Sequence, residues 1–245
     1  MAGSSAPGFL PSISGLHFRN SFPHQSLATV GIPGVATLAL GDAANGLCGG
    51  MSSTVRDLYE ARMPPPADRT PPAGGTARFE YLVERQVESL AYGSVALRLY
   101  ELGSPLLPDG EPNLGPFGLL GLVHGRATVM IVEEWPRVRA DLDGGHPSLI
   151  GLVRAVDSDP RALGRDHQVL AYAYELEGTD LSLSISIYDP NHPDDDTIRM
   201  SLSLADPGHA TPVTYAAGSP PAPLDEPTRC FIHMPYAARD PAPWR

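Results

Sequence analysis

Three residues of this chain have the side-chain types of a nucleophile, a general base and an orienting acid, and they occur in that order. Cys48 lies in the run Asn-Gly-Leu-Cys-Gly-Gly-Met-Ser-Ser, directly before a segment with helical spacing. His167 opens the strand-like run His-Gln-Val-Leu-Ala-Tyr-Ala-Tyr, and Asp189 follows the alternating run Leu-Ser-Ile-Ser-Ile-Tyr. A thiol at a helix N-terminus feels the positive end of the helix dipole, which favours the nucleophilic thiolate. The pattern predicts a Cys-His-Asp triad for acyl transfer.

Each of the three residues also has a purely structural interpretation. A single cysteine before a helix is more often a small buried hydrophobe, and a single histidine is usually a hydrogen-bonded core residue. Asp189 stands before Pro190, where an aspartate commonly closes a strand with an Asx turn. The occurrence of all three in the order Cys, His, Asp favours the catalytic interpretation. The other cysteine, Cys230, falls in an apparent core strand, so we interpret it as a packing residue.

The segments around Cys48 predict an irregular start followed by helices. Residues 1–44 are rich in Gly, Pro and Ser, and we expect an irregular arm there. Apolar residues recur at helical spacing over 48–62, where a run of three prolines stops the pattern, and again over 77–91. Residues 95–101 are consistent with a strand.

The second half of the chain predicts one more helix and then a sheet. Apolar spacing favours a helix over 127–142, although Pro136 suggests a helix start at Trp135, and Gly144 and Gly145 suit its C-terminal cap. Strands are expected over 148–155, 167–175 and 181–188 and near 229–234. Helices followed by an antiparallel sheet indicate one α+β domain over residues 1–245.

Composition excludes several classes of function. The 245 residues include 17 Lys+Arg, all of them arginine, so Schiff-base and P-loop lysine chemistry are excluded. The net charge of −11 argues against nucleic acid or an anionic membrane as a partner. Two cysteines are no disulfide framework, and no signal peptide or membrane span is visible. We therefore expect a cytoplasmic protein that needs no cofactor, with non-classical export as the alternative.

A cluster of oxygen-bearing side chains follows the last alternating strand and could suggest a calcium site. It consists of Asp189, Asn191, His192, Asp194, Asp195 and Asp196. The glycine of an EF-hand loop is absent and two prolines stiffen the run, so we interpret it as a solvated acidic loop rather than a metal site.

Several motifs together resemble a known family. They are Cys-Gly-Gly-Met, Arg-Gln, Gly-Leu-Val, His-Gln-Val-Leu-Ala-Tyr and Tyr-Asp-Pro-Asn-His-Pro. Over residues 16–240 the chain resembles the C39-like branch of the papain-like cysteine peptidases. The resemblance implies a papain-like fold of N-terminal helices packed on an antiparallel sheet. It implies Cys48 as the nucleophile, His167 as the group that takes and returns its proton, and Asp189 as the residue that orients the imidazole.

The resemblance also implies an oxyanion hole in which the Cys48 backbone N–H is one donor. Papain-like enzymes usually supply the other donor from a glutamine six residues before the cysteine, where this chain has Asp42. A carboxylate would repel the developing oxyanion. We therefore predict that Asn45 first, or Asn20 second, directs its amide to this space, and that Asp42 turns away.

We expect a cysteine-dependent hydrolase that cleaves an amide bond of a peptide or protein substrate through a thioester. With the same triad, a transferase or deamidase is the first alternative, since water or an amine can resolve a thioester. A papain-like binding protein without turnover is the second, favoured by Asp42. If the triad forms, Asp189 should accept a hydrogen bond from His167, while Asn191 and His192 point elsewhere.

Overall fold

The computed structural model describes residues 2–25, 29–32, 36–39, 43–91, 95–111, 124–178, 181–224 and 227–245. Within these ranges the chain forms N-terminal helices packed against an eight-stranded antiparallel sheet. No helix in the described ranges is both long enough and apolar enough to cross a membrane.

The sheet runs in the order β10-β4-β5-β6-β7-β8-β9, and β1 pairs with β5 beside this path. Its strands are β1 (Ala2–Ser5), β4 (Ser148–Val153), β5 (His167–Glu177), β6 (Ser182–Tyr188), β7 (Arg199–Ser203), β8 (Thr214–Ala217), β9 (Ala222–Pro223) and β10 (Cys230–His233). A separate hairpin pairs β2 (Thr29–Ile32) with β3 (Ala36–Ala39). The predicted strands 148–155, 167–175, 181–188 and the last one near 229–234 are confirmed.

The long central strand β5 organises the sheet. On one edge it pairs with β4 through its first half and with β1 through its second half, and on the other edge with β6. Because β5 and β6 are antiparallel, the start of β5 at His167 and the end of β6 at Tyr188 meet at the same end of the sheet. This geometry brings the residues that flank those two strand ends together.

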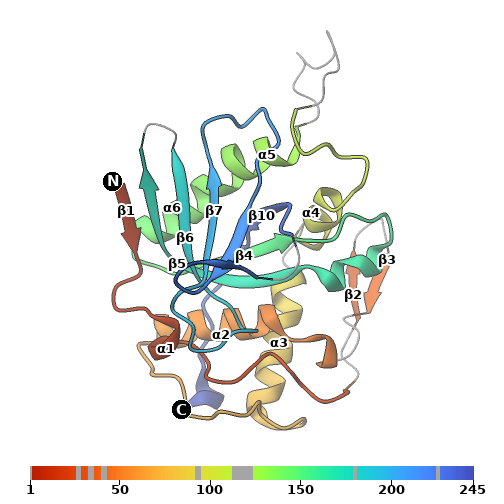
Figure 1. Cartoon of the computed structure of the whole chain (residues 1–245). Helices are drawn as coiled ribbons and strands as arrows, with labels where there is room; N and C mark the ends of the chain where they lie inside the picture. Colours follow the sequence, from red (N-terminus) through yellow and green to blue (C-terminus); the bar gives the residue numbers. More distant parts are fainter. Residues whose placement is uncertain are drawn as a thin grey trace.

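The helices pack around this framework. They are α1 (Pro11–Ser14), α2 (Cys48–Glu60), α3 (Ala77–Ala91), α4 (Val95–Leu102), α5 (Arg126–Thr128) and α6 (Trp135–Asp143), with short turns η1 (Ala43–Asn45), η4 (Pro160–Arg165) and η5 (Ala242–Trp244). Figure 1 shows α1, α2 and α3 grouped together at one end of the sheet. The helix α2 packs on α3 and on β5, whereas α6 packs along β1, β4, β5 and β10.

The predicted helices 48–62 and 77–91 are confirmed as α2 and α3, but the strand predicted for 95–101 is wrong. Those residues form the helix α4. Its buried residues are Val95, Ala96, Leu99 and Leu102, which recur at helical spacing. Burial of that one face against the rest of the molecule therefore selects the helix over the strand.

The helix predicted for 127–142 is present, with an irregularity at its centre. A short α5 leads into a π-helical segment, η3 (Val129–Glu134), and then into α6. The segment α6 begins at Trp135, as Pro136 suggested. Pro136 directly follows the π-helical segment, so its missing N–H falls where the helix changes its hydrogen-bond pattern. Gly145 follows the helix with φ of 80°, the left-handed conformation of a C-terminal cap.

Two segments contain strands that the sequence did not predict. The arm over 1–44 provides β1 to the main sheet as well as the separate hairpin, so it is more regular than expected. The Pro/Gly-rich return before the last strand contains β7, β8 and β9. These strands are short and lie among prolines. The alternation of apolar and polar residues therefore extends over too few positions to predict a strand.

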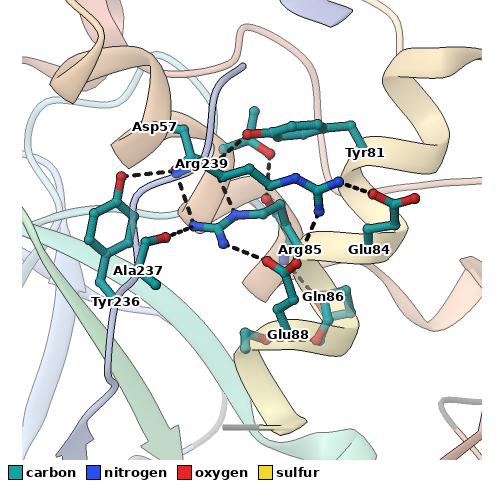
Figure 2. A network of polar contacts seen from close by, with 12 residues as sticks. Asp57, Tyr81, Glu84, Arg85, Gln86, Glu88, Tyr236, Ala237 and Arg239 are labelled. Carbon is teal, nitrogen blue, oxygen red and sulfur yellow. Dashed lines mark hydrogen bonds and ion pairs between the residues drawn. The ribbon is translucent and has the colours of Figure 1, made fainter. Parts of the chain in front are cut away.

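A buried polar network fastens the C-terminal segment to α2 and α3 (Figure 2). At its centre the Arg85 Nε lies 2.9 Å from Asp57 Oδ2, and both side chains are almost completely buried. Tyr81 and Tyr236 donate their hydroxyls to Asp57 at 2.8 and 2.9 Å. Arg239 donates its backbone N–H to the same carboxylate at 3.2 Å. Hydrogen bonds from two separate segments, α3 and the C-terminal segment, thus converge on one buried acid of α2.

Candidate active site

Cys48 is the first residue of α2, and its residue surface is partly exposed. The first turn of this helix carries no acidic residue, so no side-chain charge within it offsets the positive end of the dipole. The local sequence therefore places the thiol where a thiolate is electrostatically favoured.

Two backbone N–H groups at the start of α2 donate hydrogen bonds to side-chain oxygens. Leu47 donates its N–H to Asn20 Oδ1 at 2.6 Å, and Gly50 donates to Gln86 Oε1 at 3.0 Å. The first helical hydrogen bond, from Met51 N–H to the Leu47 carbonyl at 2.8 Å, fixes the peptide between Leu47 and Cys48. Helical geometry then directs the Cys48 N–H out of the helix end. That N–H is the backbone donor expected for an oxyanion.

Two glycines let the start of α2 fit between α3 and the sheet. A Cβ atom on Gly50 would lie 2.1 Å from the Leu82 carbonyl oxygen, and one on Gly49 would lie 2.0 Å from Gln168 Oε1. At Gly50 the neighbouring atom is backbone, so only glycine permits this approach, whereas at Gly49 a Cβ atom would require the Gln168 side chain to move. The Cys-Gly-Gly run is therefore a packing requirement of the helix end that carries the thiol.

The structure brings Cys48, His167 and Asp189 together. The Cys48 thiol lies close enough to the His167 imidazole for each group to shift the pKa of the other. His167 donates its Nε2–H to Asp189 Oδ1 at 2.7 Å, and both side chains are buried. The thiol and the carboxylate thus engage the same ring, in the spatial order expected of nucleophile, base and orienting acid.

The electrostatics of the three groups are mutually consistent. Burial opposes ionisation of the Cys48 thiol, but the hydrogen bond and charge of His167 and the N–H groups of Gln168 and Gly49 outweigh it and lower the pKa. Burial also disfavours the imidazolium, yet Asp189 and Cys48 raise the pKa of His167. Despite its burial, Asp189 has a pKa held well below its usual range by His167 and other donors. The arrangement stabilises a thiolate beside an imidazolium.

Asp189 has further donors on both of its carboxylate oxygens. Asn191 donates its backbone N–H to Oδ1 at 2.8 Å, so the Asx turn exists alongside the contact with His167. Tyr215 donates its hydroxyl to Oδ2 at 2.7 Å. His192 Nδ1 lies 3.3 Å from the same oxygen, so the expectation that His192 points elsewhere is wrong. Its position three residues after Asp189, across the turn, explains the contact.

The second oxyanion donor stays a prediction. Asn20 lies against the turn before Cys48, but its oxygen accepts from Leu47 and its amino group donates to Asn191 Oδ1 at 3.0 Å. These contacts hold the turn next to the loop after β6. The side chain of Asn45 and the whole of Asp42 lie outside the described residues.

Neither the second cysteine nor the aspartates that follow His192 in the acidic loop add chemistry to this site. Cys230 is fully buried, and burial raises the pKa of its thiol to about 12. In the acidic loop, Asp194 pairs with His17 and Arg69, and Asp196 accepts from Ser12. Across the described ranges no group of three or more His, Cys, Asp and Glu residues could hold a metal ion.

Two residues of the site escaped the sequence analysis as contributors to it. Gln86, on α3, accepts a hydrogen bond from the N–H of Gly50 at the start of α2. Tyr215 lies on β8, an unpredicted strand, and no local signal connects it with Asp189. The sequence could have placed Tyr215 on the sheet only if the short run Thr-Tyr-Ala-Ala had been assigned as a strand.

Comparison with known proteins gives no identification. The chain matches no protein-family model, no curated protein and no solved structure. The functional argument therefore rests on the geometry and electrostatics of the site.

Proposed function

We propose that this protein is a cysteine-dependent hydrolase that cleaves an amide bond of a peptide or protein through a thioester intermediate. The observation that carries the proposal is the thiol at the start of α2 beside an imidazole that lowers its pKa. That imidazole is hydrogen-bonded to a buried carboxylate whose pKa is held well below its usual range. A resemblance to C39-like, papain-like peptidases supports the same assignment, because that fold places its cysteine on a helix and its histidine on a strand.

In the acylation half, the Cys48 thiolate attacks the carbonyl carbon of the scissile amide and forms a C–S bond. The carbonyl electron pair moves to oxygen, and the Cys48 N–H donates a hydrogen bond to that oxyanion. The oxyanion collapses, the C–N bond breaks, and the His167 imidazolium gives its proton to the leaving nitrogen. An amine departs and a thioester remains on Cys48.

In the deacylation half, neutral His167 accepts a proton from water as the water oxygen attacks the thioester carbon. A second oxyanion forms and collapses, the C–S bond breaks, and the acid product leaves. The thiolate and the imidazolium are regenerated. Asp189 stays ionised throughout, keeps the ring oriented through Nε2 and stabilises the imidazolium.

The test begins with the pH dependence of Cys48 alkylation by iodoacetamide, followed by peptide mass spectrometry. An ordinary thiol with a pKa of about 8.5 reacts poorly at about pH 6. We expect Cys48 to react at that pH nearly as fast as at about pH 9, and Cys230 in the same protein to stay unlabelled. His167→Ala should restore an ordinary thiol profile. A Cys48 profile like that of a free cysteine would overturn the proposal.

Turnover is then tested with a proteome-derived peptide mixture, comparing the native protein with Cys48→Ser. New peptide termini that need the thiol support hydrolysis. Amine adducts formed in place of acids would reassign the protein as a transferase, and loss of side-chain ammonia would reassign it as a deamidase. A reactive thiolate that leaves every peptide intact would overturn hydrolysis in favour of a binding protein.

A further inference from the structure

The triad carboxylate is held on both of its oxygens, and each oxygen has its own set of donors. Oδ1 accepts from His167 at 2.7 Å and from the Asn191 N–H at 2.8 Å. Oδ2 accepts from the Tyr215 hydroxyl at 2.7 Å and contacts His192 at 3.3 Å. A carboxylate held in this way cannot rotate to exchange its oxygens without breaking hydrogen bonds in a buried site.

Tyr215 is fixed independently of the triad. It lies in β8 in register with Met200 of β7, and its carbonyl accepts the Leu224 N–H at 2.8 Å. Its side chain is buried, and the Arg154 guanidinium lies 5.4 Å from the ring centroid. Burial and the neighbouring Asp189 raise the pKa of the phenol, which keeps it protonated and able to donate.

We propose that Tyr215 is a positioning residue of the active site, which holds Asp189 in the rotamer that directs Oδ1 at His167. The inference rests on the proposed function, since it assigns a role within that site. This role gives β8 a direct contact with the proposed reaction centre at the start of β5, through the hydrogen bond from Tyr215 to Asp189.

The chemistry of the donor matters as much as its place. An arginine bonded to Oδ2 would offset the carboxylate charge and weaken its attraction for the His167 imidazolium. The phenol is neutral, so it satisfies the buried oxygen and leaves the full negative charge facing the ring. His192 makes the longer contact and is partly exposed, so it is the weaker of the two constraints.

The test is Tyr215→Phe, which removes the hydroxyl and keeps the buried ring. The matched control is Tyr174→Phe: Tyr174 is equally buried and donates its hydroxyl to Asp143 at 2.7 Å, at the end of α6. Alkylation of Cys48 by iodoacetamide is followed from about pH 5 to about pH 9. We expect the apparent thiolate pKa to rise by about one unit in Tyr215→Phe, so alkylation slows about tenfold below that pKa. The rates should converge at high pH, and the control profile should match the wild type.

A general loss of packing around a buried tyrosine would also appear in the Tyr174→Phe control. A pKa shift confined to Tyr215→Phe therefore separates positioning from a merely structural effect. A Tyr215→Phe profile that superimposes on the wild type would overturn the inference. If the wild type itself shows an ordinary thiol profile, the proposed function fails instead.

A second measurement keeps the inference testable if the variant is unstable. The Nε2 proton of His167, followed by NMR in the wild type and assigned by its loss in His167→Gln, should move when tyrosine is replaced throughout by 3-fluorotyrosine. The substitution makes the phenol a stronger donor to Asp189 and keeps every ring. An unmoved resonance would exclude the coupling through Asp189.

Discussion

Replacing Arg85 by methionine should destabilise the protein strongly, because it leaves the buried Asp57 without its charged partner (Figure 2). The side chain of Arg85 is 3% exposed and that of Asp57 is 0% exposed. Methionine keeps the length of the buried stem and removes only the guanidinium. Asp57 would then retain the hydroxyls of Tyr81 and Tyr236 and the N–H of Arg239, none of which is charged.

The magnitude follows from this burial. Breaking a fully buried ion pair costs about 3–5 kcal/mol, since the remaining charge stays in a medium of low polarity. For a protein of this length the loss corresponds to a fall in melting temperature of about 6–20 °C. The control is Arg239→Met. The Arg239 guanidinium pairs with Glu84 and Glu88 in a partly exposed setting, where ion pairs contribute about 0–1 kcal/mol.

The pH dependence gives an independent check with a defined sign. Burial raises the pKa of Asp57 even with Arg85 present, and removal of Arg85 should raise it further. A carboxyl whose pKa is higher in the folded than in the unfolded state loses stability as the pH rises through that folded pKa. The stability deficit of Arg85→Met should therefore grow between about pH 5 and about pH 8, because Asp57 is protonated at the lower pH.

The assay is urea unfolding followed by far-ultraviolet circular dichroism at each pH, with linear extrapolation to water. The m-value should stay unchanged while the midpoint falls. A deficit for Arg85→Met no larger than that of Arg239→Met, or one that shrinks as the pH rises, would refute the reasoning.

The same physical reasoning gives two further predictions. Gly50→Ala should lower the free energy of unfolding in urea by about 1–3 kcal/mol, because the new Cβ would meet the backbone oxygen of Leu82. The control Gly164→Ala, at a position with no atom within 4 Å, should lower it by less than about 0.5 kcal/mol. Equal losses in the two variants would contradict the close approach at Gly50. In a Cys48→Ala background, Asp189→Asn should destabilise most between about pH 4 and about pH 6.5. There the lowered pKa of Asp189 and the raised pKa of His167 both stabilise the fold, and the second contribution is lost as the pH rises through the folded pKa of the imidazole. A deficit that keeps growing up to about pH 9 would contradict the pair.

Local signals in the sequence determined the elements that carry the candidate triad. The helix that begins at Cys48 is encoded by the spacing of its apolar residues and by the prolines after it. The strands that place His167 and Asp189 are encoded by an apolar run and by alternation, and their antiparallel pairing follows from the short connection between them. These signals depend on residues that are close together in the chain, so they can be recognised from the sequence alone.

Tertiary structure alone decided the remaining features. Residues 95–101 suit a strand or a helix by spacing, and only the burial of one face of α4 selected the helix. The contact of Tyr215 with Asp189 joins residues that are 26 positions apart through strands whose register depends on the whole sheet. The buried pair of Asp57 and Arg85 is likewise set by the packing of α2 on α3. A local pattern can specify which face of an element is apolar, but the partner of a buried polar group depends on which distant segment packs there, and that is fixed only when the chain folds.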